Sequence, residues 1–131
     1  MNEKRNRRLT GGVGVFLLCI GGGILALLGT HALDSPVLLA QALLLGLAGV
    51  VDIVAATDTA LTDRIAWYRW SGLGNVFLGI SLPLGFVGTE TPGGFVLLAV
   101  VALGGLSLAA LGVDMLAFHG KYTRGERLDR R

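Results

Sequence analysis

Residues 93–119 read GGFVLLAVVALGGLSLAALGVDMLAFH, and the ionisable side chains in this stretch are Asp114 and His119, near its end. A helix needs about 20 apolar residues to cross the hydrocarbon core of a bilayer, at about 1.5 Å of rise per residue. Lipid offers no water to unpaired backbone groups, so a segment of this kind must be helical. The stretch therefore predicts a transmembrane helix that is long enough to tilt.

Three other segments have the same character: residues 9–29, 36–57 and 70–88. Pro36 and Pro92 stand at or just before the starts of two of the four segments, where a missing N–H costs a helix nothing. The hydrophobic fraction of 53% and the mean hydropathy of +0.69 suit a chain that is surrounded by lipid. We expect an all-α integral membrane protein, a four-helix bundle that forms a single domain over residues 1–131.

The positive charges are confined to three places outside the apolar segments. The 11 Lys and Arg residues are Lys4, Arg5, Arg7 and Arg8, then Arg64 and Arg69, then Lys121, Arg124, Arg127, Arg130 and Arg131. The other two connections hold His31, Asp34 and Glu90 but no Lys or Arg. Basic segments stay in the cytoplasm during insertion. The pattern predicts an N-in/C-in protein of the plasma membrane, with cytoplasmic tails at residues 1–7 and 120–131.

The chain also reads as one helical hairpin written twice. RLTG at residues 8–11 resembles RWSG at residues 69–72, and Val-Asp at residues 51–52 recurs at residues 113–114. Two-span units keep the same orientation in the membrane, so their copies form a parallel repeat about an axis along the membrane normal. We expect repeat one to cover residues 8–57 and repeat two to cover residues 69–119.

Residues 75–86 read NVFLGISLPLGF. This segment resembles the SPW-repeat membrane proteins, small prokaryotic proteins built of repeated two-helix hairpins with a Ser-Pro-Trp signature in the first helix. Here Leu82 separates Ser81 from Pro83, and no Trp follows. The resemblance implies a small integral membrane protein and brings no catalytic residue with it.

Two carboxylates are the ionisable groups that lie well inside the segments, Asp52 and Asp114. An ionisable side chain within a span is by default a functional hypothesis with a partner to be named. The expected partners are Arg8 and Arg69, whose long side chains can reach the carboxylates from the inner boundary. Asn75 extends this polar layer. The first interpretation is two Arg–Asp clasps, one per hairpin. The alternative is a pseudo-symmetric carboxylate pair on a proton or cation path.

Several kinds of chemistry are disfavoured by the residue types. No segment contains a Lys, which argues against a retinal-type Schiff base. Cys19 is the one cysteine, so a relay of paired thiols is excluded. His31 and His119 fall at opposite ends of the membrane, and no cluster has metal-ligand spacing. We therefore predict no enzyme activity, no cofactor and no metal site.

The most economical function is a structural or accessory one. We expect a small membrane protein that packs with itself, as a homo-oligomer, or with a larger membrane partner. The alternative is a small proton- or cation-conducting channel or carrier that uses Asp52 and Asp114. The expected partner of the basic tails is the lipid bilayer and not nucleic acid, since the tails hold only Tyr122 for stacking on bases.

Overall fold

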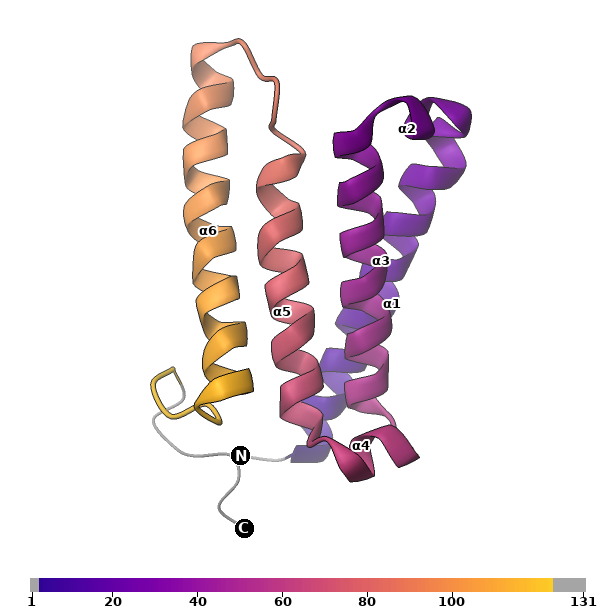
Figure 1. Ribbon diagram of the computed structural model, residues 1–131, viewed down its shortest axis with the longest axis vertical. Coiled ribbons are helices and arrows are strands. Elements are labelled where there is room, and N and C mark those ends of the chain that lie inside the picture. The colour runs from indigo at the N-terminus through magenta and orange to yellow at the C-terminus, as the bar shows by residue number, and fades with distance from the viewer. Residues whose placement is uncertain (1–2, 124–131) are drawn as a thin grey trace.

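The computed structural model of the protein describes residues 3–123, apart from the side chain of Ala32, and all regular secondary structure within them is helical (Figure 1). The remainder of the predicted C-terminal tail, residues 124–131, lies outside the described residues. The helices are α1 (Glu3–Leu28), α2 (Thr30–Asp34), α3 (Pro36–Ala56), α4 (Ala60–Arg64), α5 (Trp67–Leu84) and α6 (Pro92–Ala117).

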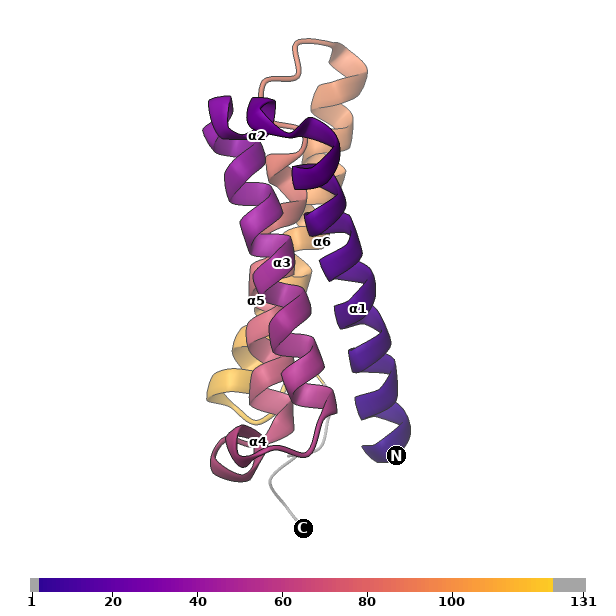
Figure 2. The same ribbon diagram turned by 90° about the vertical axis from the view of Figure 1, so that its right-hand side faces the viewer.

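The long helices pack in the order in which they follow along the chain. α3 packs on α1 and on α5, and α5 packs on α6. Figures 1 and 2 show two hairpins, α1 with α3 and α5 with α6, which meet through α3 and α5. α1 and α5 begin, and α3 and α6 end, at the same end of the molecule (Figure 1). We call this the basic end, after its exposed side chains Arg8, Arg64, Arg69 and Lys121.

Local rules explain where α3 and α6 begin. The Ser35 hydroxyl accepts a hydrogen bond from the Leu38 amide at 3.4 Å, and the Thr91 hydroxyl accepts one from the Gly94 amide at 3.1 Å. Each cap is followed by a proline in the first turn of its helix. The proline fixes a helical φ and lacks an N–H that would have had no partner there. The starts predicted at residues 36 and 93 agree with these helices to within a residue.

The third predicted segment is placed wrongly at both ends. We expected residues 70–88, and α5 instead covers Trp67–Leu84. The helix stops early because Pro83 lies in its last turn, where the ring removes an N–H and crowds the preceding turn. The chain then turns through Gly88, which has a φ of 86°.

Within residues 3–123, three helices are long and apolar enough to cross a membrane: α1, α3 and α6. The expectation of four such spans is therefore met for three of them. α5 is the exception, because its 18 residues include Arg69 in the first turn and also the polar side chains Ser71, Asn75 and Ser81. Ser71 and Ser81 are buried, and Asn75 is half-buried. α5 packs between α3 and α6, and Nδ2 of Asn75 contacts the sulfur of Met115 on α6.

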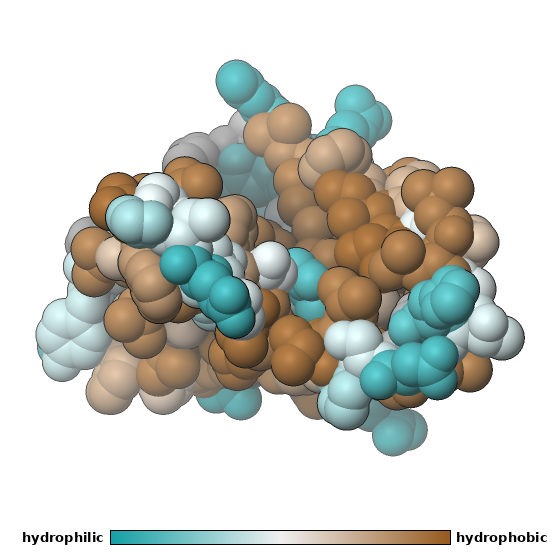
Figure 3. Space-filling view, turned by 90° about the horizontal axis from the view of Figure 1, so that it is seen from above, coloured by the Kyte–Doolittle hydropathy of each residue, from teal (hydrophilic) through white to brown (hydrophobic). Residues whose placement is uncertain are grey.

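Large apolar side chains lie outside and small residues lie inside. In the described part of the chain, the largest fully buried side chains are Met115 and Ser81. By contrast, Phe16 on α1 is 63% exposed and Leu103 on α6 is 67% exposed. Figure 3 shows how much of the surface seen from above is apolar. A protein in water buries such side chains, whereas lipid solvates them.

The two hairpins are held by glycines at matching places. In the first, a Cβ added at Gly14 would lie 2.7 Å from the Gly49 carbonyl oxygen. In the second, a Cβ added at Gly72 would lie 2.8 Å from the Gly112 carbonyl oxygen. No side chain fits at these positions, so the backbones of the paired helices touch.

A second contact recurs two helical turns further along each hairpin. A Cβ at Gly21 would meet the Ala42 carbonyl oxygen and the Gly46 amide nitrogen, each at 3.0 Å. A Cβ at Gly79 would meet the equivalent atoms of Gly105 and Ala109, with 2.9 Å to the Ala109 amide nitrogen. Both hairpins therefore pair a glycine on one helix with two small residues a turn apart on the other.

This contact pattern corrects the register expected from the sequence. The Cβ of Asp52 would lie 3.0 Å from a Cβ at Gly14, and the Cβ of Met115 would lie 2.9 Å from a Cβ at Gly72. Asp52 therefore corresponds in position to Met115 and not to Asp114. The match of Val-Asp at residues 51–52 and 113–114 is displaced by one residue, which places the two carboxylates on different faces of their helices.

Candidate functional site

The hairpins meet where polar side chains of α3 face Gly74 of α5 and Gly85, the residue that follows α5. Near the basic end, a Cβ added at Gly74 would lie 2.5 Å from Oδ1 of Asp52. Near the other end, a Cβ added at Gly85 would lie 2.7 Å from Nε2 of Gln41. The absence of side chains at these two glycines therefore provides the room for Asp52 and Gln41.

Asp52 lies where α1, α3 and α5 meet. Its Cβ faces Gly14 of α1 and its carboxylate faces Gly74 of α5, so the side chain is 5% exposed. Oδ1 is buried and has no hydrogen-bond partner among the described residues. Buried polar atoms in proteins are nearly always bonded, so an orphaned carboxylate oxygen marks a site where another group can act.

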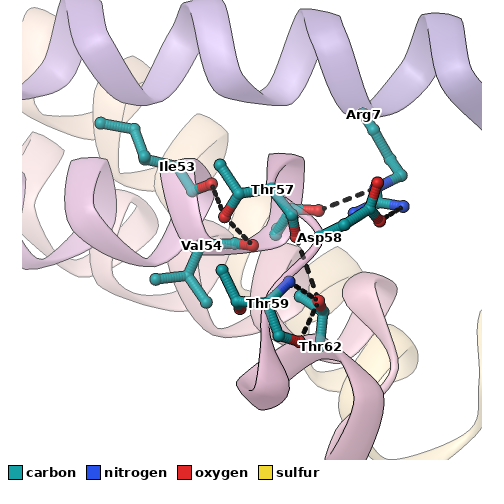
Figure 4. A network of polar contacts seen from close by, with 8 residues as sticks. Arg7, Ile53, Val54, Thr57, Asp58, Thr59 and Thr62 are labelled. Atoms are coloured by element: carbon teal, nitrogen blue, oxygen red, sulfur yellow. Dashed lines mark hydrogen bonds and ion pairs between the residues drawn. The ribbon is translucent and has the colours of Figure 1, made fainter.

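Arg7 of α1 lies about two turns from Gly14 toward the basic end. Its Nη1 forms an ion pair with Oδ1 of Asp58 at 2.6 Å, and its Nε donates to the Ala55 carbonyl oxygen at 3.2 Å (Figure 4). Arg7 is 18% exposed and Asp58 is 90% exposed. Ala55 follows Asp52 by about one turn of α3. The guanidinium therefore ties α1 to the end of α3 immediately below the buried carboxylate.

Two further buried atoms near this junction lack partners within residues 3–123. They are Nη2 of Arg7 and Nε1 of Trp70. Trp70 precedes Gly74 by about one turn of α5, so it lies one turn nearer the basic end than the contact with Asp52. Arg7 binds the Ala55 carbonyl oxygen, about one turn of α3 from Asp52, so both donors come from residues that lie nearer the basic end than Asp52. A buried donor or acceptor that lacks a protein partner can bind a water molecule.

Threonines hold the connection that carries Asp58. The Thr57 hydroxyl donates to the carbonyl oxygens of Ile53 at 3.2 Å and Val54 at 3.1 Å. The Thr62 hydroxyl accepts from the Thr59 amide at 2.9 Å and donates to the Thr57 carbonyl oxygen at 3.0 Å (Figure 4). These bonds close the turn between α3 and α4. The exposed Asp58 is thereby presented to Arg7.

Asp114 has a different role from Asp52, although it is equally buried. Both of its oxygens accept hydrogen bonds from the Tyr122 amide, at 3.3 and 3.2 Å. Oδ2 also accepts from the Thr123 amide at 2.8 Å and from the Thr123 hydroxyl at 2.5 Å. The chain returns to the carboxylate through His119 and Gly120, which have φ values of 58° and 79°. Asp114 therefore fastens the chain that follows α6.

The predicted partners of the two carboxylates are wrong for the described residues. Arg8 is exposed on α1, and neither it nor Asp52 forms an ion pair with a described residue. Arg69 does not reach Asp114, since its Nη2 lies 3.2 Å from Nε2 of His119. Neither expected Arg–Asp clasp forms among the described residues: Asp114 binds Tyr122 and Thr123 instead, and Oδ1 of Asp52 has no hydrogen-bond partner there.

Asn75, the remaining predicted site residue, joins α5 to α6. Its Nδ2 donates to the Met115 sulfur at 3.9 Å. Met115 stands where the first hairpin has Asp52, so the polar layer expected at this depth is divided between two separate junctions. Asp52 lies at the junction of α1, α3 and α5, and Asn75 lies between α5 and α6.

Sequence reasoning missed the ion pair between Arg7 and Asp58. The signal for Arg7 was present, because Arg7, Gly14 and Gly21 are spaced two helical turns apart and share the face of α1 that packs on α3. Arg8 lies about 100° further round the helix. The contact of Asp114 with Thr123 had no such signal, since it depends on a turn outside the helix.

Within the described part of the chain, no group of three His, Cys, Asp or Glu side chains could hold a metal ion. The architecture is that of a small helical membrane protein, with three apolar helices of spanning length and large apolar side chains on its outside. The chain belongs to the family of unknown function DUF7994, which matches residues 5–129. No curated protein and no solved structure matches the chain.

Proposed function

We propose that this protein is a structural or accessory component of the plasma membrane, without enzyme activity, that packs with itself or with a larger membrane protein. In this proposal α1, α3, α5 and α6 all cross the bilayer, and both termini are cytoplasmic. The basic end faces the cytoplasm, as expected for segments rich in Lys and Arg. The resemblance of residues 75–86 to SPW-repeat proteins implies the same class of protein.

The crossing of α5 is supported by its place between α3 and α6. A helix that lies between two others can carry polar residues, because the neighbouring helices cover them. Ser81 is fully buried, and its hydroxyl donates to the Leu78 carbonyl oxygen at 2.9 Å. α5 therefore needs less apolar surface than the helices at the edges of the row.

A parallel repeat is supported by the glycine contacts. Gly14 and Gly21 meet small residues of α3 in the same way that Gly72 and Gly79 meet small residues of α6. We infer that each hairpin is one copy of a two-helix unit. The copies are best aligned on these glycines, and not on the pair of aspartates.

The structural role is supported by one observation: the polar side chains of the helices bind other segments of the same protein. Arg7 binds the end of α3, Asn75 binds Met115 of α6, and Asp114 binds Tyr122 and Thr123. Each of these side chains joins one segment of the protein to another. Because these side chains hold the segments of the protein together, they support a structural role.

One observation favours the alternative of a proton or cation path, and it concerns Asp52. Oδ1 of Asp52 is buried and has no hydrogen-bond partner among the described residues. A carboxylate that is free of internal bonds can bind and release a proton. In this candidate function Asp52 acts alone, since the oxygens of Asp114 are bonded to the chain after α6.

Proteoliposomes distinguish the two functions. The purified protein is reconstituted, a potassium diffusion potential is applied with valinomycin, and internal pH is followed with a trapped dye. The structural role predicts the same proton entry as in protein-free vesicles, for wild type and Asp52→Asn alike. Proton entry that requires the wild-type Asp52, in vesicles that contain equal amounts of folded Asp52→Asn, would establish the path and contradict the structural role.

A further inference from the structure

The first turns of α1 carry a basic hollow that the contacts between helices do not use. It has a volume of about 350 Å³, and the described residues that line it are Lys4, Arg5, Arg8 and Leu9. All four side chains are exposed. Unlike Arg7, none of these three cations forms an ion pair with a described residue. The hollow therefore presents positive charge that is available to an external anion.

An apolar strip continues from this hollow along the same face of α1. Leu9, Val13, Phe16 and Ile20 are all exposed, and their spacing puts them on one side of the helix, in line with Arg5. Gly12 lies beside this strip, and a Cβ added there would meet no atom within 4 Å. The surface thus changes from basic to apolar along one face of α1 as the helix leaves the basic end.

This order of chemistry matches one ligand. A guanidinium binds phosphate oxygens through paired N–H donors, and an ammonium binds them as a point charge. An acyl chain binds apolar side chains at the depth of the hydrocarbon. A molecule that has both parts, in this order and this close together, is a phospholipid with a net negative headgroup.

We propose that α1 holds an anionic phospholipid, with its phosphate in the hollow formed by Lys4, Arg5 and Arg8 and an acyl chain along Leu9, Val13, Phe16 and Ile20. The bound lipid lies on the exposed face of α1, about a third of a turn round the helix from the contact of Gly14 and Gly21 with α3. This inference rests on α1 lying in the bilayer, as in the proposed function, and it adds a defined lipid to it.

Native mass spectrometry of the full chain in detergent tests this site. Binding is compared for phosphatidylglycerol and phosphatidylcholine with identical acyl chains. We expect the wild type to prefer phosphatidylglycerol. The variant Arg5→Gln/Arg8→Gln should lose about tenfold or more of that preference, because each Lys or Arg near the membrane surface adds to the attraction for anionic lipid. The matched control is Arg64→Gln/Lys121→Gln, which removes two exposed charges at the same end outside the hollow, and it should change the preference less than about threefold.

Three results would overturn the proposal. The first is equal binding of the two lipids by the wild type. The second is an equal loss in the control variant, which would mean that total charge and not the hollow attracts the lipid. The third is displacement of phosphatidylglycerol by an equal concentration of soluble glycerol 3-phosphate, which would make this a site for a free anion.

A second variant tests the acyl strip without changing charge. Phe16→Ala should weaken both lipids alike and keep the preference for phosphatidylglycerol, because Phe16 contacts the chain and not the headgroup. Unchanged affinity for both lipids would contradict the strip. If cysteine labelling placed α1 outside the bilayer, the proposed function would fail. If α1 spans the bilayer and the lipid preference is absent, only this inference fails.

Discussion

Asp52 of α3 occupies the space that the missing side chain of Gly74 leaves on α5, with its Oδ1 placed 2.5 Å from where a Cβ at Gly74 would stand. The carboxylate is thereby enclosed at the seam between the two hairpins. It gains no hydrogen bond to Oδ1 from the described residues in return. The contact between Asp52 and Gly74 is therefore closely packed, although a buried oxygen of Asp52 lacks a hydrogen bond from the described residues.

The first prediction is that Gly74→Ala destabilises the protein through Asp52. The added methyl group would overlap the carboxylate, and overpacking of this kind costs about 1–3 kcal/mol. In the double variant with Asp52→Ala the overlap is absent, so the loss should be smaller than the sum of the single losses. The measurement is thermal unfolding in detergent. Gly12→Ala is the control, because its Cβ meets nothing within 4 Å. Additive losses would mean that Gly74 and Asp52 do not share a space.

The second prediction is that Asp52→Asn preserves or raises thermal stability, whereas Asp114→Asn lowers it. An unpaired carboxylate is costly to bury, and the amide removes its charge at nearly the same volume. Asp114 instead accepts several bonds from Tyr122 and Thr123, which an amide nitrogen cannot accept. The measurement is the melting temperature of each variant, compared with the wild type in the same detergent. A marked drop for Asp52→Asn would show that its charge is compensated after all.

The third prediction separates the two adjacent arginines of α1. Arg7→Gln should lose about 0.5–1.5 kcal/mol, since the bond to the Ala55 carbonyl oxygen disappears and the pairing with the exposed Asp58 adds little. Arg8→Gln removes the same charge from an exposed position, so stability should change by less than about 0.5 kcal/mol. Chemical unfolding of both variants in one detergent provides the comparison. Equal losses would place both arginines on the face that packs against α3.

The fourth prediction tests the equivalence of the hairpins. Gly49→Ala places a methyl group 2.6 Å from the Gly14 carbonyl oxygen, and Gly112→Ala places one against the Gly72 carbonyl oxygen. Both should lose about 1–3 kcal/mol, because backbone cannot move aside as a flexible side chain does. Gly104→Ala on the open face of α6 should be neutral or slightly stabilising, as alanine favours helix. A neutral Gly49→Ala or Gly112→Ala would contradict the matched contacts.

Much of the helical architecture follows from local rules. The apolar runs, together with Pro36 and Pro92 at the starts of α3 and α6, predict these helices closely. The end of α5 is harder to predict from the sequence, because it depends on how Pro83 and the glycines after it turn the chain. The interior of a membrane protein is formed by the packing of small residues. Hydropathy does not predict which small residues pair across helices.

The polar contacts were harder to foresee than the helices. Arg8 and Arg7 are equally basic, and only the phase set by Gly14 and Gly21 tells which one faces α3. Asp52 and Asp114 share a Val-Asp motif, yet one faces a neighbouring helix and the other binds the chain after α6. The contact of Asp114 requires a left-handed backbone conformation at His119, and no sequence pattern predicts that conformation.

The central claim is that all four long helices cross the membrane, and α5 is the decisive one. Single cysteines in a Cys19→Ser background at Asp34, Ala60 and Glu90, which are all exposed in the structure, report the side of each connection. With a thiol reagent that does not cross membranes, intact cells should label Asp34→Cys and Glu90→Cys, and Ala60→Cys should react only after the cells are opened. Labelling of Ala60→Cys and Glu90→Cys from the same side would show that α5 does not cross, and would contradict the account.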